Sequence, residues 1–423
     1  MAEFARSMPE HRPLQPAPKE AGLWRNRTFR TVFASYSLSL LGNTFHSIAL
    51  NLWVLQTTGS AKLMSLVLIT HLVISMLFGS IAGTVADRVN RRQLMIAADL
   101  FRFLIVGGIA LCMALPDTPF FLILALTAIV ALAGAFRGPA FQASLIEIVG
   151  KSGVSGAVAA ISVSDNLIRI AGYAAGGTAV ALFGGVFAVA LDASTFLVSG
   201  MLLLFAGRFP YAAPERQERE KTSFRADFAE GFRVVWNNRF VRGAVMLLPL
   251  VMFFFLSTFM LIQVMAVQVW QASPLIFGLL EACIPLGYVV GSIIIMRFDN
   301  RLRHRGKLAL ISIVLMGPLF TAISFIGSAA PALPLIGLVG VLFSFSTTIL
   351  FILIRVAVAP SLQGRVFGLL GTLTSVAPPV GLAVFSALSD QFGPAVIMTY
   401  SGIAMLIAGT AAFIGLRSMR EYN

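Results

Sequence analysis

The sequence predicts an all-α polytopic membrane protein, with twelve transmembrane helices in two pseudo-symmetric halves of six helices each. Of its 423 residues, 58% are hydrophobic and 12% are charged, whereas about a quarter of the residues in ordinary soluble domains are charged. Twelve apolar segments each approach the roughly 20 residues that a helix needs to cross the hydrocarbon core. A basic elbow between apolar segments recurs in both halves of the chain, which indicates an internal repeat.

The apolar segments divide six and six around a polar linker. The expected spans cover residues 31–55, 63–86, 93–115, 119–145, 155–182, 186–207, 241–270, 274–297, 307–328, 331–357, 364–389 and 393–416. The expected organisation is a disordered cytoplasmic tail (1–22), an N-terminal half (23–207), a cytoplasmic linker (208–240), a C-terminal half (241–417) and a second cytoplasmic tail (418–423).

The end of the linker carries an amphipathic pattern. Apolar and aromatic residues recur there at helical intervals with charged residues between them: Phe224, Phe228, Phe232, Val235 and Trp236. A helix of this kind lies in the plane of the membrane surface. We expect it to connect the two halves rather than to bind a ligand.

The net charge of +13 is a topology signal. Nearly all cations outside the spans lie in alternate connections: the N-terminal tail, 88–92, 208–242, 297–307 and the C-terminal end. The connections of the other parity hold one cation, Lys62. The positive-inside rule then places both termini and the linker in the cytoplasm, in a cell membrane. Anionic membrane lipids are the expected partners of this charge, and nucleic acid is not.

The two cysteines, Cys112 and Cys283, both lie in apolar runs, so the sequence predicts no disulfide framework and no metal site. The letters GKS at 150–152 lack the upstream glycine of a phosphate-binding loop, because Leu145 stands at that position. We therefore expect no cofactor and no ATP site. No nucleophile and base stand together in a pattern typical of an enzyme.

Glycine pairs precede the two basic elbows. Gly79 and Gly83 near the end of the second span recur as Gly287 and Gly291 in the eighth, each displaced by 208 positions. Glycines four residues apart remove bulk from one helix face and let another helix approach closely. The elbows that follow read ADRVNRR and MRFDNRLRHR.

The first elbow resembles the loop 2–3 signature of the major facilitator superfamily, G-x-x-x-D-R-x-x-R-R. The matching residues are Gly83, Asp87, Arg88, Arg91 and Arg92. Further blocks are similar to the branch of macrolide efflux and siderophore export proteins: LLGNTFHSIAL, LQTTGS, ADLFR, GPAFQASLIEIV, IRIAGYAAGG, LDASTF and QGRVFGLL. The resemblance runs from about residue 23 to 416.

The resemblance implies a gating latch at the first elbow. Asp87 would face the positive N-terminal end of span 11, near Gly364 and Arg365. We expect this contact to close the cytoplasmic gate and to break when the halves rock apart. The alternative is an ordinary basic loop with one acid. The second elbow lacks this acid-base spacing, so we expect only the first to act as a full latch.

Two departures from the family pattern weaken an assignment of antiport from resemblance alone. Asn43 stands where many relatives have an aspartate. Gly172 and Tyr173 replace a Gly-Pro pair associated with antiporters, although Gly176 and Gly177 remain as small residues for helix packing.

Ionisable residues inside spans are costly and usually face a partner or a cavity. Asp99 and Arg102 are three residues apart, and Asp165 and Arg169 are four apart, so the members of each pair share a helix face. Either these acids exchange protons as substrate moves, or the pairs are structural. The sequence leaves both interpretations open.

Other polar residues in the spans are secondary candidates. His46 lies near Asn43 at mid-depth, where a histidine can titrate or form a structural hydrogen bond. Glu281 has no cation nearby in the sequence and is a candidate second proton site. We expect Asp192 to form a packing hydrogen bond, and Arg137 to extend toward the interface.

From the resemblance we expect a monomeric secondary transporter that exports small amphiphilic molecules by proton antiport and alternating access. A lipid or lysolipid flippase and a siderophore exporter are alternatives, in which Arg102 and Arg169 would bind an anionic substrate. A non-transporting membrane receptor is a more distant alternative.

Overall fold

The computed structural model describes residues 23–207, 209, 224–298 and 304–420, and every regular element among them is a helix. The predicted all-α membrane fold is confirmed. Eleven of these helices are long and apolar enough to cross a membrane.

The N-terminal half contains one short 3-10 helix and five long helices. They are η1 (Leu23–Arg25), α1 (Arg27–Thr58), α2 (Ala61–Ala86), α3 (Arg91–Ala114), α4 (Phe120–Phe183) and α5 (Gly185–Phe205). Helix α1 begins before the expected residue 31 because the Asn26 side chain caps it by accepting a hydrogen bond from the Phe29 backbone N–H. It ends at Thr58, and the next residue is Gly59, whose positive φ of 64° favours glycine.

Helix α4 accounts for two of the predicted spans. Its 64 residues would extend about 96 Å as one straight helix, roughly three times the thickness of the hydrocarbon core. Gly150 interrupts it with φ 71° and ψ 171°, a conformation that suits glycine. The two segments, 120–149 and 151–183, each have the length of a span. The eleven helices therefore provide twelve crossings.

The remaining elements follow the linker. They are α6 (Phe224–Asn237), α7 (Arg239–Gln268), α8 (Pro274–Phe298), α9 (Arg305–Ser324), α10 (Ala329–Ala357), α11 (Pro360–Phe392), α12 (Pro394–Gly415) and α13 (Arg417–Arg420). Residues 299–303, which are half of the predicted second elbow MRFDNRLRHR, lie outside the described residues.

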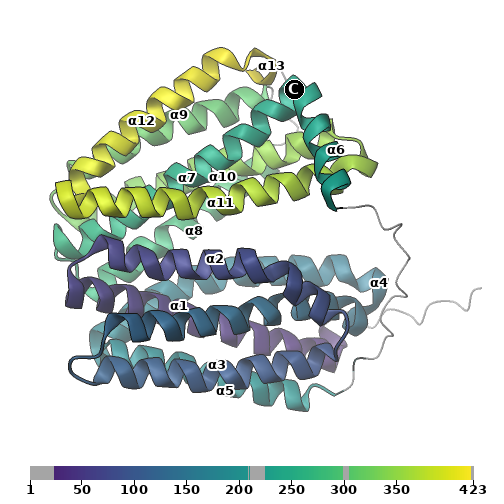
Figure 1. Cartoon of the computed structure of the whole chain (residues 1–423), viewed down its shortest axis with the longest axis vertical. Coiled ribbons are helices and arrows are strands. Elements are labelled where there is room, and N and C mark those ends of the chain that lie inside the picture. Colours follow the sequence, from purple (N-terminus) through teal and green to yellow (C-terminus); the bar gives the residue numbers. More distant parts are fainter. Residues whose placement is uncertain (1–22, 208, 210–223, 299–303, 421–423) are drawn as a thin grey trace, which may run out of the picture.

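Figure 1 shows two helical bundles side by side, α1–α5 and α7–α12, with α2 facing α11 and with α6 at one end. We call the end that carries the α2–α3 turn (87–90) and α6 the basic end. The opposite end carries the α1–α2 turn (59–60) and the α11–α12 turn at Gly393. Helix α6 packs on α11 and α7, both in the C-terminal half, so its expected role in connecting the two halves stays a prediction.

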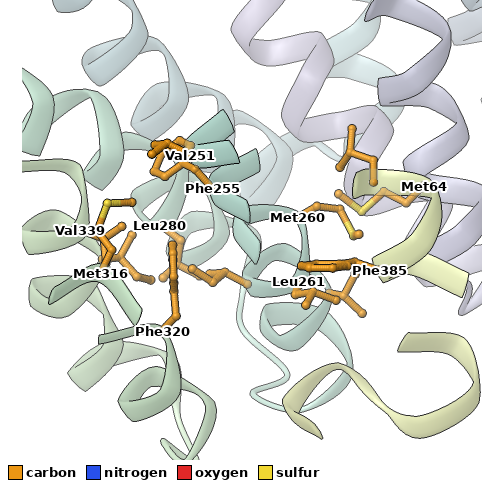
Figure 2. Packing of buried hydrophobic residues seen from close by; sticks show 14 of the residues in the cluster. Met64, Val251, Phe255, Met260, Leu261, Leu280, Met316, Phe320, Val339 and Phe385 are labelled. Atoms are coloured by element: carbon orange, nitrogen blue, oxygen red, sulfur yellow. The ribbon is translucent and has the colours of Figure 1, made fainter. Parts of the chain in front are cut away.

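The larger hydrophobic cluster extends through the C-terminal half and into all five long helices of the N-terminal half. In Figure 2, Val251, Phe255, Leu280 and Phe320 gather inside the C-terminal bundle, and Met64 of α2 approaches from the other half. In a bilayer the lipid is as apolar as these side chains, so close packing rather than exclusion of water holds the helices together.

Close helix contacts form at some predicted glycines and not at others. A Cβ atom added at Gly287 would overlap the backbone carbonyl oxygen of Gly337, and one at Gly291 would lie 2.8 Å from the Ser344 Cβ. Helices α8 and α10 therefore need both glycines. In contrast, an atom added at Gly79 would meet nothing within 4 Å.

Gly83 likewise has nothing within 4 Å of an added Cβ atom. The second segment of α4 is different, because Gly172 and Gly176 pack directly on α1. An added Cβ would overlap Thr44 Oγ1 at Gly172 and would lie 3.2 Å from the Phe45 Cα at Gly176. The glycines of α2 thus have empty space beside them in this arrangement. Helix α1 fills the space beside the glycines of α4.

Candidate functional site

Asp99 pairs with an arginine from another helix. The Nε atom of Arg137 in α4 lies 2.6 Å from Asp99 Oδ1, and the Ser199 hydroxyl donates to Asp99 Oδ2 over 2.7 Å. Asp99 is 0% exposed and Arg137 is 6% exposed. The expectation that Arg137 extends to the interface is therefore wrong, because a buried carboxylate on α3 offers it a counter-charge at depth.

Arg102 takes separate partners although it shares a helix face with Asp99. It donates to Asn43 Oδ1 over 2.7 Å, and its guanidinium carbon lies 3.8 Å from the centroid of the Phe196 ring. The residue that departs from the family pattern, Asn43, is thus the direct partner of this buried arginine. An aspartate there would form an ion pair instead of a neutral hydrogen bond.

One turn along α1, His46 faces an acid of α5. Its Nδ1 atom lies 3.2 Å from Asp192 Oδ2, and Asp192 is 1% exposed. The Thr195 hydroxyl donates to the Asp192 backbone carbonyl. This Thr195 bond lies within α5, whereas the contact that Asp192 makes with another helix is its carboxylate facing His46 of α1, a partner that the sequence did not indicate.

Asp165 and Arg169 of α4 also separate. The Tyr36 hydroxyl of α1 donates to Asp165 Oδ2 over 3.1 Å, while the Tyr36 ring stacks on Phe141 at 4.2 Å. Arg169, one turn further along, is exposed although it lies well inside a membrane-spanning segment. It forms a side-chain hydrogen bond with Tyr173 and lies within electrostatic reach of Asp165.

Glu281 of α8 lies in the contact between the two halves. It is 6% exposed, its electrostatic neighbours are Gln263 of α7 and Tyr173 of α4, and no described cation lies within 4.0 Å of it. Asn51 of α1 donates to Gln263 Oε1 over 3.4 Å and so links this group to the N-terminal half. A buried carboxyl group whose neighbours are an amide and a phenol can gain or lose a proton without breaking an ion pair.

At the basic end, the signature residues of the elbow bind within the N-terminal half. Arg91 lies 3.2 Å from Asp87 and 2.7 Å from Glu147 of α4. Arg92 donates to the backbone carbonyls of Leu203 and Leu204 at the end of α5, where a cation complements the helix dipole.

Arg88 is exposed and, with the residues around it, lines a hollow of about 710 Å³. The start of α11, which was the expected partner of Asp87, contacts α6 instead. Arg365 lies 2.9 Å from Glu230 of α6, and a Cβ added at Gly364 would meet nothing within 4 Å. The latch between Asp87 and α11 is not formed in this arrangement, and it stays a prediction for another state.

The halves meet at the opposite end instead. Gln268 of α7 donates to the Gly59 carbonyl over 2.7 Å, and the Ser65 and Ser386 hydroxyls are 2.7 Å apart between α2 and α11. Asp390 of α11 accepts hydrogen bonds from the start of α2. Sequence reasoning missed Asp390. The available signal was a lone acid just beyond span 11, on the side whose connections carry one cation.

Comparison with known proteins identifies the family. Residues 21–422 match the family model described as transmembrane secretion effector. The chain is 27% identical over 417 residues to the multidrug efflux pump Tap of Mycobacterium tuberculosis, covering 94% of this chain and 95% of that protein. It is 22% identical over 371 residues to macrolide efflux protein A of Streptococcus pyogenes, covering 86% of this chain and 90% of that protein.

Solved structures share the fold at low identity. An inward-facing bacterial homologue of the iron transporter ferroportin superposes with a TM-score of 0.74 at 12% identity, over 93% of this chain and 99% of that one. An inward-facing, occupied bacterial homologue of the lysosomal transporter Spinster gives a TM-score of 0.73 at 13% identity, over 94% and 98% of the two chains. The family match, together with the paired bundles and the elbow between α2 and α3, shows that this chain belongs to the transmembrane secretion effector family of the major facilitator superfamily.

Proposed function

We propose that the protein is a monomeric secondary transporter that exports small amphiphilic molecules from the cytoplasm by alternating access, with proton entry as the driving force. The observation that carries this proposal is the asymmetric contact between the halves. They are bonded across the opposite end through Gln268 and Asp390, whereas the signature residue Asp87 at the basic end has no contact with α11. Such an arrangement is one end point of a rocking cycle.

The positive-inside rule supports the orientation. The basic end carries Arg88, Arg91 and Arg92, and the opposite-end turn after α1 carries only Lys62 close by. We assign the basic end to the cytoplasm on this ground. On this assignment the halves are bonded to each other at the outer end, as an exporter needs when it accepts its cargo from the cytoplasm.

The relatives support amphiphilic cargo, because one is named a macrolide efflux protein and another a multidrug efflux pump. Among the phenylalanines of α7, Phe255 stacks on Phe343 at 3.7 Å and belongs to the core. Phe253 and Phe254 are only partly buried and pack around Phe385 of α11. We propose Phe253 and Phe254, which pack against the buried Phe385, as an apolar surface for cargo.

Glu281 is the residue that we propose for proton coupling. Asp99 already has a cation at 2.6 Å and Asp192 has His46 at 3.2 Å. Among the described residues no basic side chain lies within 4.0 Å of Glu281, so the closed contact between the halves is compatible with a neutral acid. When that contact opens, water reaches the carboxyl group and allows the proton to leave.

The test is transport in proteoliposomes with an imposed pH gradient and a panel of cationic dyes, macrolides, siderophores and lysolipids. The unmodified protein should accumulate at least one compound against its gradient. Glu281→Gln should lose that accumulation but keep substrate exchange without a proton gradient. Asp117→Asn, an equivalent change in an exposed turn, should behave like the unmodified protein. Proton-driven accumulation by Glu281→Gln would exclude Glu281 as the coupling group.

The exposed Arg169 favours a second candidate, an anionic amphiphile such as a lysolipid or a siderophore. An exposed cation inside a membrane-spanning segment attracts a negative headgroup strongly, because the surrounding medium screens it less than bulk water does. Arg169→Gln should then abolish transport of the anionic members of the panel and spare the cationic dyes. Loss of both classes to the same extent would argue against a role in selecting charge.

A further inference from the structure

Helices α2 and α11 run antiparallel where the two halves meet. The N-terminal end of α2, at Ala61, lies beside the C-terminal end of α11, at Phe392, and the other two ends lie toward the basic end. Each helix therefore presents the positive end of its dipole to the end of its partner that carries the negative one.

A carboxylate fills this contact at the opposite end. Asp390, in the last turn of α11, accepts hydrogen bonds from the Ser60 hydroxyl at 2.6 Å, the Ala61 backbone N–H at 2.7 Å and the Lys62 backbone N–H at 3.2 Å. The backbone groups belong to the first turn of α2, whose N–H groups have no partner within their own helix. An acid of one half thus caps a helix of the other half.

The basic end has the same elements in the reverse order. Asp87 is the residue that directly follows α2, and the N-terminal end of α11 begins at Pro360. Here the two have other partners: Asp87 lies 3.2 Å from Arg91 of its own half, and Arg365 near the start of α11 lies 2.9 Å from Glu230 of α6. Each helix therefore carries one acid at its C-terminal end, and only the acid at the closed end is bound to the partner helix.

We propose that Asp390 is a gate latch that holds the opposite end closed, and that Asp390 and Asp87 alternate as caps on each other's helices during the cycle. The proposal rests on the alternating access inferred above and names residues that set its conformational balance. The α2 helix of 26 residues spans about 39 Å, so a rigid rocking motion that joins one pair of ends separates the other. The two caps cannot both form.

The second contact between the halves has a different chemistry. Gly177 of α4 and Gly278 of α8 meet so closely that a Cβ added at Gly177 would lie 2.9 Å from the Gly278 Cα. The last turn of α4, which ends at Phe183, contains no acid. Packing of glycines has little directional preference, whereas a charge-assisted cap is made or broken as a unit. Asp390 is thus the polar and switchable part of the closed end.

The experiment measures distances between spin labels, which requires no knowledge of the substrate. Cys112 and Cys283 are first replaced by alanine, and the background is accepted if it remains folded and monodisperse. One label pair, at the exposed Gln56 and Ser328, reports on the opposite end.

A second pair, at the exposed Ser152 and Lys307, reports on the basic end. Asp390→Asn replaces one acceptor oxygen with an amide group that faces N–H donors. The ratio of molecules with an open opposite end to molecules with a closed one should therefore rise roughly tenfold. Asp87→Asn should shift it in the reverse direction, and the double variant should lie between them. Asp117→Asn, at the same end as Asp390 but outside the contact, should leave both distances unchanged.

Unchanged distances at the opposite end in Asp390→Asn would overturn the latch. Shifts of the same sign in Asp390→Asn and Asp87→Asn would overturn the alternation. Neither result depends on transport, so the latch can fail while export in proteoliposomes succeeds. Conversely, reciprocal shifts without transport of any compound in the panel would support the latch and count against the proposed function.

Discussion

The ion pair of Asp99 and Arg137 allows a quantitative test of whether a buried acid is structural. Both side chains are almost fully buried, with 2.6 Å between the charged atoms, and the Ser199 hydroxyl is the further donor to the carboxylate. Removing one partner of a buried pair leaves an uncompensated charge and typically costs about 3–5 kcal/mol. Arg137→Met should therefore lower the free energy of unfolding by about 3–5 kcal/mol.

The double variant Asp99→Asn/Arg137→Met should recover most of this loss. Asparagine keeps the shape of aspartate and can still accept from Ser199, while methionine fills part of the space of the arginine without a charge. We expect a coupling energy of about 3 kcal/mol between the two positions. The measurement is equilibrium unfolding of the purified variants in mixed detergent and dodecyl sulfate micelles, monitored by tryptophan fluorescence.

Asp87 and Arg91 form a matched control at the surface. Their atoms are 3.2 Å apart and the Asp87 side chain is 49% exposed, so the same double-variant cycle should give only about 0.3–0.5 kcal/mol. If Asp99→Asn and Arg137→Met prove additive, the pair contributes no net coupling and the structural interpretation is refuted. If Asp99→Asn leaves stability unchanged but abolishes proton-driven transport, Asp99 has the coupling role that we assign to Glu281.

Two further predictions concern helix contacts. Gly287→Ala should reduce the yield of folded protein in detergent, because the added Cβ would overlap the Gly337 carbonyl. Gly79→Ala should fold normally, because its added Cβ would meet nothing within 4 Å. Equal yields of the two variants would contradict this account of the α8–α10 contact. Glu230→Gln should loosen α6 from α11 by removing the charge that lies 2.9 Å from Arg365, so amide exchange in α6 should rise several-fold while that in α7 stays constant. Unchanged exchange in α6 would show that packing alone holds this helix.

The fold was accessible from the sequence because each span carries its own signal. Hydrophobic length and the alternating distribution of cations are local properties, so twelve crossings follow even where the structure joins two of them at Gly150. In a bilayer every backbone polar group must be satisfied within its segment, which leaves an apolar segment few alternatives to a helix.

The partners of the buried charges were not accessible in this way. Spacing along one helix suggested Asp99 with Arg102 and Asp165 with Arg169. The structure gives Asp99 an arginine of α4 and gives Asp165 the hydroxyl of Tyr36. Residues three or four apart on a helix point outward to neighbouring helices, and those neighbours decide the pairing. Which helices are neighbours is a tertiary property that spacing does not encode.

The latch at Asp87 illustrates a second limit. A signature motif selects residues for their role over a whole cycle, whereas a structure holds one arrangement of the halves. Asp87 therefore binds Arg91 in its own half, while Arg365 binds Glu230. The sequence could name the residue, and only the geometry shows which end is closed.

The chain reversal at Gly150 also affects how the protein unfolds when force pulls it out of the bilayer. Glu147 binds Arg91 at the basic end, and Gly177 meets α8 at the opposite end, so the chain turns back on itself with a single non-helical residue between the two segments of α4. No loop lies between the two segments that could extend when the chain is pulled. Under mechanical force the segments 120–149 and 151–183 should leave the bilayer together, in one step, as a hairpin rather than as two separate helices.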